Sequence, residues 1–257
     1  TKDWAREEAD KIIAKARNWN VPELPGLGRR PGEPALNAAT AWQLTREKVF
    51  AEKVAQLWRR FADPEQGYPS RLGWRDNWAH TGGVFQNMIR AYDDVRDADV
   101  FTEEDTQLIH NAVRTYLDLT LTELNGGIGN QPLSPITGTL YAALVLQDWE
   151  RVERFLEGPC GIYWQIRRGI MDDGWTVEVS TGYNMFCARM FTKAGLALRP
   201  WGVEILNDRF RAVYHESVET SARPGEPGGP WREPEVGMFA SAWGAVPPEL
   251  PPHPGHV

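Results

Sequence analysis

Residues 102–124, TEEDTQLIHNAVRTYLDLTLTEL, decide the fold class of this chain. Apolar residues such as Ile109 and Val113 recur three or four positions apart, which is the spacing of one face of an amphipathic helix. Thr102, followed three positions later by Asp105, is typical of a capping box, in which two side chains bond each other's backbone N–H at a helix start. The stretch therefore predicts a helix over residues 103–124.

Helical periodicity continues on both sides of this stretch. Apolar residues at helical spacing, separated by runs rich in glycine and proline, predict further helices. These helices are expected over residues 3–19, 38–61, 84–92, 133–146, 160–171, 177–198 and 203–218. An alternation of strands and helices is not indicated. The pattern predicts an all-α fold in which paired helices form an α/α toroid, an incomplete barrel of about eight or more helices.

Two regions differ in composition. Residues 1–220 are predicted to form the toroid domain. Residues 221–257 are dense in proline and glycine, which is typical of a linker or of the start of a further domain.

The composition excludes some classes of function. Hydrophobic residues make up 42% and charged residues 25% of the 257, an ordinary globular balance. Apolar runs are too short for a membrane span. The net charge of −7 lacks the basic footprint of a nucleic-acid-binding protein. An anionic sugar polymer remains possible as a substrate, because a cleft can be locally basic in an acidic protein.

Metal and cofactor motifs are not evident in the sequence. Cys160 and Cys187 are too far apart in sequence to define a disulfide framework or a metal site, and the simplest interpretation is two buried thiols. Zinc, calcium and nucleotide-binding patterns are missing, so we expect neither a metal nor a cofactor. The 12 tryptophans are expected either to pack in the core or to stack against sugar rings.

Three loops at predicted helix junctions combine polar and aromatic residues. They are WRDNWAHTGG at 74–83, NGGIGNQPLS at 125–134 and MDDGWTVEVSTGYN at 171–184. In an α/α toroid, alternate junctions fall on one face and line a cleft. The three loops are therefore expected to share a substrate site.

The second and third loops resemble the helical domain of heparinase II/III-like and related alginate lyases. In these enzymes an Asn begins one helix, and a Tyr follows two helices later after a DG…E…S…Y pattern. Asn130 and Tyr183 match this order and spacing, within GNQ and DGWTVEVSTGYN. Two features depart from the family: Gln131 stands where many relatives have His, and relatives carry a β-sandwich domain after the toroid, which would be a partner domain outside this chain.

The resemblance implies a lyase that cleaves a uronic-acid-containing polysaccharide by β-elimination, without a metal or cofactor. Such an enzyme removes the proton at C5 and expels the oxygen at C4. Tyr183 would be the acid and base, and Asn130 and Gln131 would neutralise the uronate carboxylate. His80 is a further candidate base or carboxylate ligand, and its alternative role is that of a buried structural histidine or a residue at a helix start. Such an enzyme is expected to be secreted or periplasmic, with its signal peptide removed before residue 1.

Further residues of the loops are candidates for substrate binding. Arg75 suits a substrate carboxylate or a salt bridge with its neighbour Asp76. Glu178 suits the orientation of Tyr183 or a surface ion pair. The full set of expected substrate-binding residues is Trp74, Arg75, Asn77, Trp78, Trp175 and Glu178.

Two alternative functions fit the same sequence. A glycoside hydrolase on an α/α toroid would use Asp76, Asp172 or Asp173 as its acid, although Asp-Asp-Gly is also a turn signal. A helical carbohydrate-binding module without catalysis is the second. The polymer is not identified by the sequence, and alginate, glycosaminoglycans, glucuronans and ulvan all remain open.

Overall fold

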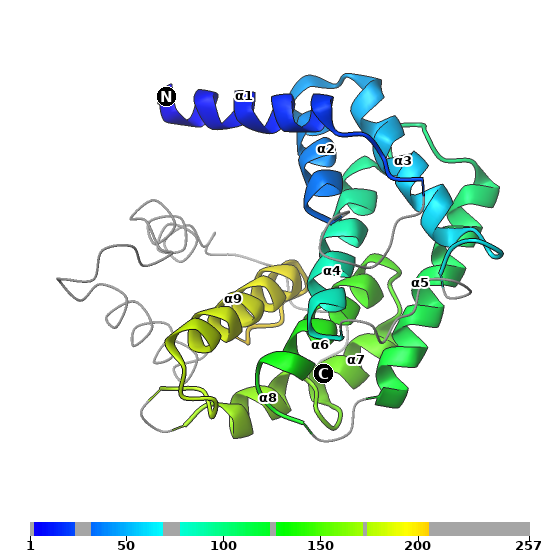
Figure 1. The fold of residues 1–257 in the computed structure, drawn as a ribbon. Coiled ribbons are helices and arrows are strands. Elements are labelled where there is room, and N and C mark those ends of the chain that lie inside the picture. The colour runs from blue at the N-terminus through cyan, green and yellow to red at the C-terminus, as the bar shows by residue number, and fades with distance from the viewer. Residues whose placement is uncertain (1–2, 24–31, 69–77, 124–126, 172–173, 206–257) are drawn as a thin grey trace. The chain divides into compact units, whose positions relative to one another are not determined.

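A computed structural model describes residues 3–23, 32–68, 78–123, 127–171 and 174–205 (Figure 1). The helices are α1 (Asp3–Asn18), α2 (Gly32–Thr45), α3 (Lys48–Ala62), α4 (Trp78–Val95), α5 (Glu103–Glu123), α6 (Asn130–Val145), α7 (Trp149–Glu157), α8 (Ile162–Gly169), α9 (Thr181–Leu198) and the short 3-10 helix η1 (Arg199–Trp201). Within these ranges the only β-type pairing is an isolated bridge between Ile170 and Thr176. The prediction of an all-α fold is confirmed.

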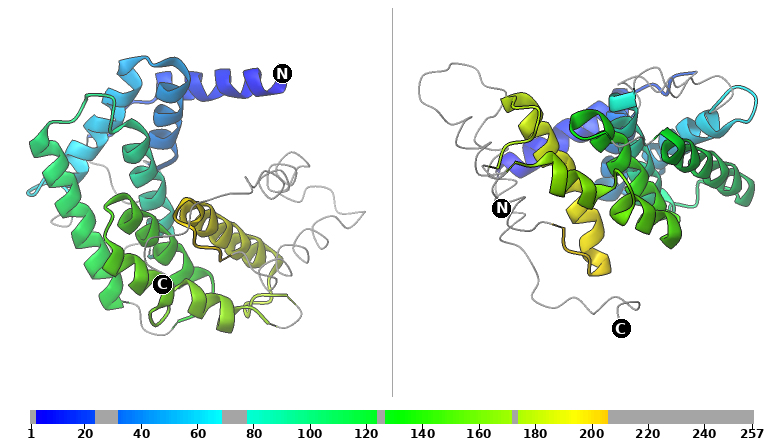
Figure 2. Two further views of the ribbon diagram at one scale, coloured as in Figure 1. Left: turned by 180° about the vertical axis from the view of Figure 1, so that it is seen from behind. Right: turned by 90° about the horizontal axis from the view of Figure 1, so that it is seen from below.

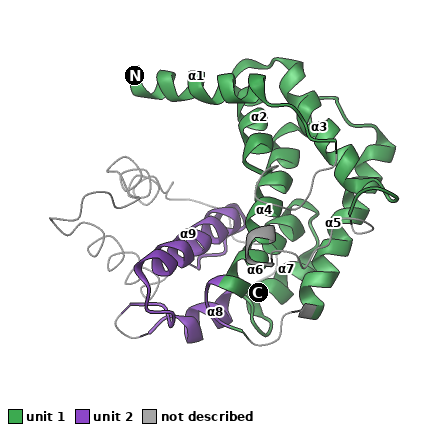
Figure 3. Ribbon diagram, viewed as in Figure 1, with its two compact units in different colours: residues 1–127, 131–161 green, residues 128–130, 162–257 purple. Residues whose placement is uncertain are grey.

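The chain divides into two compact units (Figure 3). Unit 1 contains residues 1–127 and 131–161, and unit 2 contains residues 128–130 and 162–257. This division falls inside the predicted toroid domain. The predicted boundary at residue 221 lies outside the described residues.

The core of unit 1 is an aromatic cluster around Trp58 of α3. The Trp58 ring meets Phe61, Phe85 and Tyr92 edge-on or nearly so, with centroids 5.3, 6.2 and 5.9 Å away. Its indole N–H donates to the backbone oxygen of Met88 at 3.1 Å. Large aromatic side chains bury much apolar surface, and here they also join α3 to α4.

Glycines at the helix contacts let α4 pack closely against α2 and α6. A Cβ on Gly82 would lie 2.3 Å from the backbone of Ser134 and Pro135 in α6, and a Cβ on Gly138 would lie 2.5 Å from the Gly82 oxygen. A Cβ on Gly32 of α2 would lie 2.7 Å from the Val84 oxygen. These glycines let the helix backbones approach each other closely.

The predicted helix 38–61 is wrong as a single element, because the chain breaks between α2 and α3. Arg46 adopts a left-handed φ of 60°, and its N–H donates to the Trp42 oxygen at 2.7 Å. The Thr45 hydroxyl donates to the Ala41 oxygen and accepts from the Glu47 N–H. These local bonds end one helix and start the next, whereas the apolar stripe continues through the break.

The boundaries of other helices agree with the sequence to different degrees. The capping box is confirmed: the Thr102 N–H donates to Asp105 Oδ2, and the Asp105 N–H donates to Thr102 Oγ1, each at 3.0 Å. The predicted helix 177–198 begins only at Thr181, because Val179 has a left-handed φ of 47° and Ser180 is extended. The expected helix from residue 203 is not formed at 203–205, and the remainder lies outside the described residues.

Basic side chains of α3 bind the ends of neighbouring segments. Lys53 Nζ donates to the backbone oxygens of Ala16, Arg17 and Trp19 at 2.6–2.8 Å, which satisfies carbonyls at the C-terminal end of α1. Burial and the nearby Arg17 lower the pKa of Lys53. Arg59 binds Asp105 through both carboxylate oxygens and also the Val100 oxygen. α3 is thereby tied to the start of α5.

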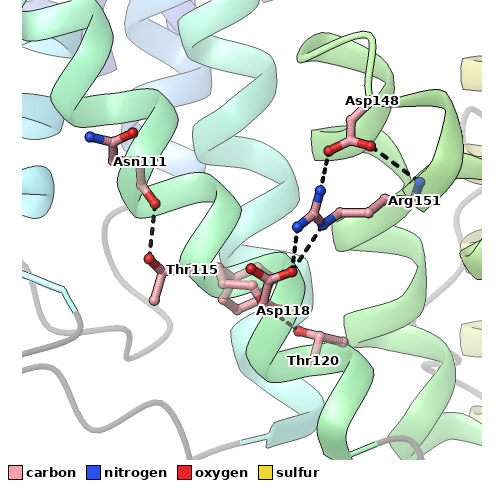
Figure 4. Close-up of polar contacts among 7 residues, drawn as sticks. Asn111, Thr115, Asp118, Thr120, Asp148 and Arg151 are labelled. Atoms are coloured by element: carbon pink, nitrogen blue, oxygen red, sulfur yellow. Dashed lines mark hydrogen bonds and ion pairs between the residues drawn. The ribbon is translucent and has the colours of Figure 1, made fainter.

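Arg151 joins α5 to the start of α7 (Figure 4). Its guanidinium donates to Asp118 Oδ1 at 2.6 and 3.0 Å and to the N-cap residue Asp148. Asp148 also accepts the Arg151 backbone N–H at 3.2 Å. Asp118 is mostly exposed, so this bridge orients α7 more than it stabilises the unit.

Unit 2 is built on α8 and α9. α9 continues directly into η1 (Figure 2). Cys187 of α9 and Cys160 of unit 1 are both buried and are not disulfide-bonded, as the simplest interpretation predicted. No helix in the described ranges combines the length and apolar character needed to cross a membrane.

Replacing Lys53 with methionine is expected to lower the free energy of unfolding by about 1–3 kcal/mol, because three carbonyls lose a charged donor. Urea unfolding, with amide exchange in α1, measures the effect. Lys48→Met is the control, since Lys48 is exposed at the start of α3. Equal stability of the two variants contradicts the role assigned to Lys53.

Asp105 is expected to make the free energy of unfolding depend on pH in the acidic range. The hydrogen bond with Arg59 is the chief cause that lowers the pKa of Asp105. The contribution of Asp105 to the free energy of unfolding is therefore complete above the ordinary carboxyl pKa of about 3.9. It is lost as the pH falls through the lowered pKa of Asp105 in the folded protein. Asp105→Asn should cost about 1 kcal/mol at pH 7, and this difference from the native chain should shrink below about pH 4.

Urea midpoints between pH 2.5 and 7 test this dependence. Asp97→Asn is the matched control, because the Asp97 side chain is 97% exposed. A stability difference for Asp105→Asn that stays constant over this pH range contradicts the prediction.

Candidate functional site

The structure describes only part of the expected site. Trp74, Arg75 and Asn77 lie outside the described residues, as do Asp76, Asp172 and Asp173 of the hydrolase alternative. Trp78 and His80 form the first turn of α4 in unit 1, but their side chains lie outside the described part. Gln131 is an exposed residue of α6 and belongs to unit 1. The other expected residues, Asn130, Trp175, Glu178 and Tyr183, all belong to unit 2.

The two sequence motifs meet at Asn130 and Glu178. Asn130 is the first residue of α6, and its Nδ2 donates to Glu178 Oε1 at 2.6 Å. A carboxylate only accepts hydrogen bonds, so this contact fixes which end of the Asn130 amide faces Glu178. Glu178 was expected to orient Tyr183 or to form a surface ion pair. The residue that it orients in the structure is Asn130.

Gly129 lets Glu178 reach Asn130. Its φ of 103° is in the left-handed region, and a Cβ at this position would lie 2.8 Å from Glu178 Oε1. Its N–H donates to the side-chain oxygen of Gln165 in α8 at 3.1 Å. Glycine is needed here for both conformation and space. Residues 128–130 are therefore bonded to α8 on one side and to Glu178 on the other.

The segment 174–180 is held in place at both ends. The Met171 N–H donates to the Trp175 oxygen at 2.7 Å, and the Val177 N–H donates to the Gly169 oxygen at 3.0 Å. The Thr176 N–H donates to Asn184 Oδ1 at 2.8 Å. Asn184 is fully buried in the first turn of α9. These bonds place Glu178 between α8 and α9.

Tyr183 precedes Asn184 in the same turn of α9. Its side chain is 52% exposed, whereas Asn184 is 0% exposed. Burial of Asn184 thus fixes the first turn of α9 and leaves the phenol of Tyr183 accessible to a ligand. Trp175 is half-buried within the same unit.

Two buried acceptors in this segment lack a hydrogen-bond partner among the described residues. They are Glu178 Oε2 and the Thr176 hydroxyl oxygen. Burial, with the negative charge of Glu178 adding to it, raises the pKa of the nearby Cys187 thiol to about 12. Cys187 therefore stays neutral near pH 7 and does not act as a nucleophile.

Comparison with known proteins finds no match, either to a protein-family model or to a curated protein. A cluster of three or more His, Cys, Asp or Glu that could hold a metal ion is not found in the described ranges. The arrangement in unit 2 offers an oriented amide, an acidic partner and an accessible phenol. These groups can bind a sugar carboxylate and transfer a proton.

Sequence reasoning missed Gln165 and Asn184, the two buried amides that anchor the site. Asn184 closes the quoted motif STGYN, so its position beside Tyr183 was a usable signal. Gln165 lies in a helix of ordinary amphipathic pattern, and nothing in the sequence connects it to Gly129.

Asn130→Asp is expected to lower the free energy of unfolding by about 1–3 kcal/mol, because it replaces the donor to Glu178 with a second carboxylate. Adding Glu178→Gln to this variant should recover at least about 1 kcal/mol, since the amide of Gln can again donate to the new carboxylate. Urea unfolding of both single variants and the double variant measures the coupling.

Asn111→Asp is the control for a change of charge. Asn111 is exposed on α5 and accepts a hydrogen bond from Gln107, which the carboxylate preserves. Its stability should stay within about 0.5 kcal/mol of the native chain. Strictly additive effects at positions 130 and 178 contradict the pairing.

Proposed function

We propose that the chain is the helical part of a polysaccharide lyase, folded as an α/α toroid, that cleaves a uronic-acid-containing polysaccharide by β-elimination. The observation that carries the proposal is the hydrogen bond from Asn130 to Glu178. It joins the two motifs on which the resemblance to heparinase II/III-like and alginate lyases rests. Tyr183 supports the proposal because it belongs to the same unit and its side chain is accessible.

The oriented amide of Asn130 suits the first requirement of the reaction. A uronate carboxylate makes the neighbouring C5 proton poorly acidic, and a donor on that carboxylate stabilises the enolate-like transition state. Asn130 gives one N–H to Glu178 and retains a second N–H for the substrate carboxylate. Glu178 thereby sets the direction of the remaining donor before the substrate arrives.

Proton transfer is assigned to Tyr183. The phenol removes the proton at C5 or returns a proton to the C4 oxygen as it leaves. The fixed turn formed by Asn184 keeps the Tyr183 backbone in place. Gln131 and His80 remain further candidates for carboxylate binding, and Trp175 for contact with a sugar ring.

Tyr183→Phe is expected to lower the rate of elimination by about 10²- to 10⁴-fold, which is the usual contribution of a positioned acid or base. The assay follows the ultraviolet absorbance of the unsaturated uronyl end on alginate, hyaluronan, chondroitin sulfate, glucuronan and ulvan. It uses this chain and any longer natural form of the protein. Tyr163→Phe, a partly buried tyrosine of α8 in the same unit, is the matched control.

The products discriminate between the rival functions. New reducing ends without ultraviolet absorbance indicate a hydrolase, and binding without either product indicates a carbohydrate-binding module. Full elimination activity in Tyr183→Phe refutes the role of this residue.

A further inference from the structure

α8 presents two exposed arginines that each stack on an aromatic ring of the same helix. The Arg168 guanidinium lies 4.0 Å from the centre of the Trp164 ring, and that of Arg167 lies 5.7 Å from the Tyr163 ring. Each pair is four residues apart, which places both members on the same side of the helix. A guanidinium over an aromatic ring keeps its N–H groups in its own plane, pointing outward, where they remain able to bind an anion.

Among the described residues of unit 2, basic side chains outnumber acidic ones, whereas the other residues of unit 2, which include Asp172 and Asp173, carry more acidic than basic side chains by sequence. The described basic residues are Arg167, Arg168, Arg189, Lys193 and Arg199, and the described acidic residues are Glu178 and Glu204. Glu204 lies 3.5 Å from Arg199, and Glu178 is bound to Asn130. Neither of these two acidic residues is therefore paired with Arg167 or Arg168.

The helix that carries these arginines is bonded directly to the candidate site. Gln165 Oε1 accepts the N–H of Gly129, the residue before Asn130. Arg168 is three positions after Gln165, so the two side chains are neighbours on the helix surface. Arg167 is two positions after Gln165 and projects from the opposite side. Of the two arginines, Arg168 is therefore the one nearer on the helix surface to the side chain that binds Gly129.

An anionic substrate needs a cation at this place. Glu178 puts a carboxylate next to Asn130, and its charge repels the carboxylate of an approaching uronate. A donor amide alone does not cancel this repulsion. A guanidinium on the helix that binds Gly129 offsets part of this repulsion, and bidentate contact with carboxylate or sulfate oxygens adds directional binding.

We propose that Trp164 and Arg168 form an anion subsite for the polysaccharide. Arg168 binds the carboxylate or sulfate oxygens of a sugar unit, and the Trp164 ring is the platform that holds the guanidinium in position. The inference rests on the proposed function, because it takes the anionic polymer as the ligand. It adds a binding residue and a positioning residue that are distinct from Asn130 and Tyr183.

The indole nitrogen of Trp164 supports the role of a platform. It is buried and has no hydrogen-bond partner among the described residues. A buried donor without a partner is unfavourable, so the nitrogen itself does not explain tryptophan at this position. The large ring under Arg168 does explain it, because tryptophan gives the strongest cation–π contact of the aromatic side chains.

Arg168→Gln is expected to weaken binding of an anionic polysaccharide by about tenfold or more, the effect of losing a charge-assisted hydrogen bond. Calorimetric titration at low salt uses three probes: alginate and hyaluronan, which carry carboxylates only, and chondroitin sulfate, which carries both groups. Loss confined to chondroitin sulfate identifies sulfate as the bound group, and loss on all three identifies the carboxylate. Either loss supports the subsite.

Arg167→Gln is the matched control. It removes an exposed arginine of the same charge, also stacked on a ring, from the other side of α8. Its affinity should stay within about twofold of the native chain, since long-range attraction between exposed charges is weak. Equal losses in the two variants overturn the subsite and indicate only general attraction to a basic helix. Failure of the native chain to bind any of the three probes also overturns it.

Two variants of Trp164 test the platform. Trp164→Phe keeps a ring under Arg168 and removes the buried N–H, so we expect affinity within about threefold of native. Trp164→Leu removes the ring and should weaken binding about as much as Arg168→Gln. A loss in Trp164→Phe equal to that in Trp164→Leu overturns the platform role.

Measurements of polysaccharide binding and of elimination activity distinguish a failure of the subsite from a failure of the proposed lyase function. Binding that depends on Arg168 without the unsaturated product supports the subsite and refutes the lyase. Elimination activity with an unchanged KM in Arg168→Gln refutes the subsite and leaves the lyase standing.

Discussion

The close crossing of α4 and α6 is the constraint on which unit 1 depends. Gly82 and Gly138 bring the two backbones so near that any Cβ at either position would meet main-chain atoms. α6 is buried along most of its length, from Leu133 to Leu144, and is therefore fixed by packing rather than by its own polar contacts.

The ends of helices could be predicted from the sequence where a side-chain cap defines them. They could not be predicted where an unusual backbone conformation ends the helix. Thr102 and Asp105 carry their capping role in their chemistry, so the start of α5 was evident. Arg46 and Val179 take left-handed conformations that neither residue type favours. Local backbone and side-chain hydrogen bonds accompany these conformations, and the hydrophobic pattern runs through both positions without a sign of them.

The candidate site was predictable in its residues but not in its connections. Asn130, Glu178 and Tyr183 were identified from two motifs, and all three belong to unit 2. The bond between Asn130 and Glu178 joins residues far apart in sequence, and only the fold decides such a pair. Gln165 and Asn184 hold the surrounding backbone through buried amides, for which a single sequence offers no periodic signal. Residues 69–77, with three of the expected sugar-binding residues, lie outside the described part of the chain.

Gly129 has a consequence for the way related sequences can diverge. The Glu178 carboxylate occupies the space that a side chain at position 129 would need. A larger residue at 129 would need both a shorter residue at 178 and a backbone that leaves its left-handed conformation. Among homologues, glycine is therefore expected at 129 wherever an acid stands at 178, and loss of the acid removes only the steric part of this requirement.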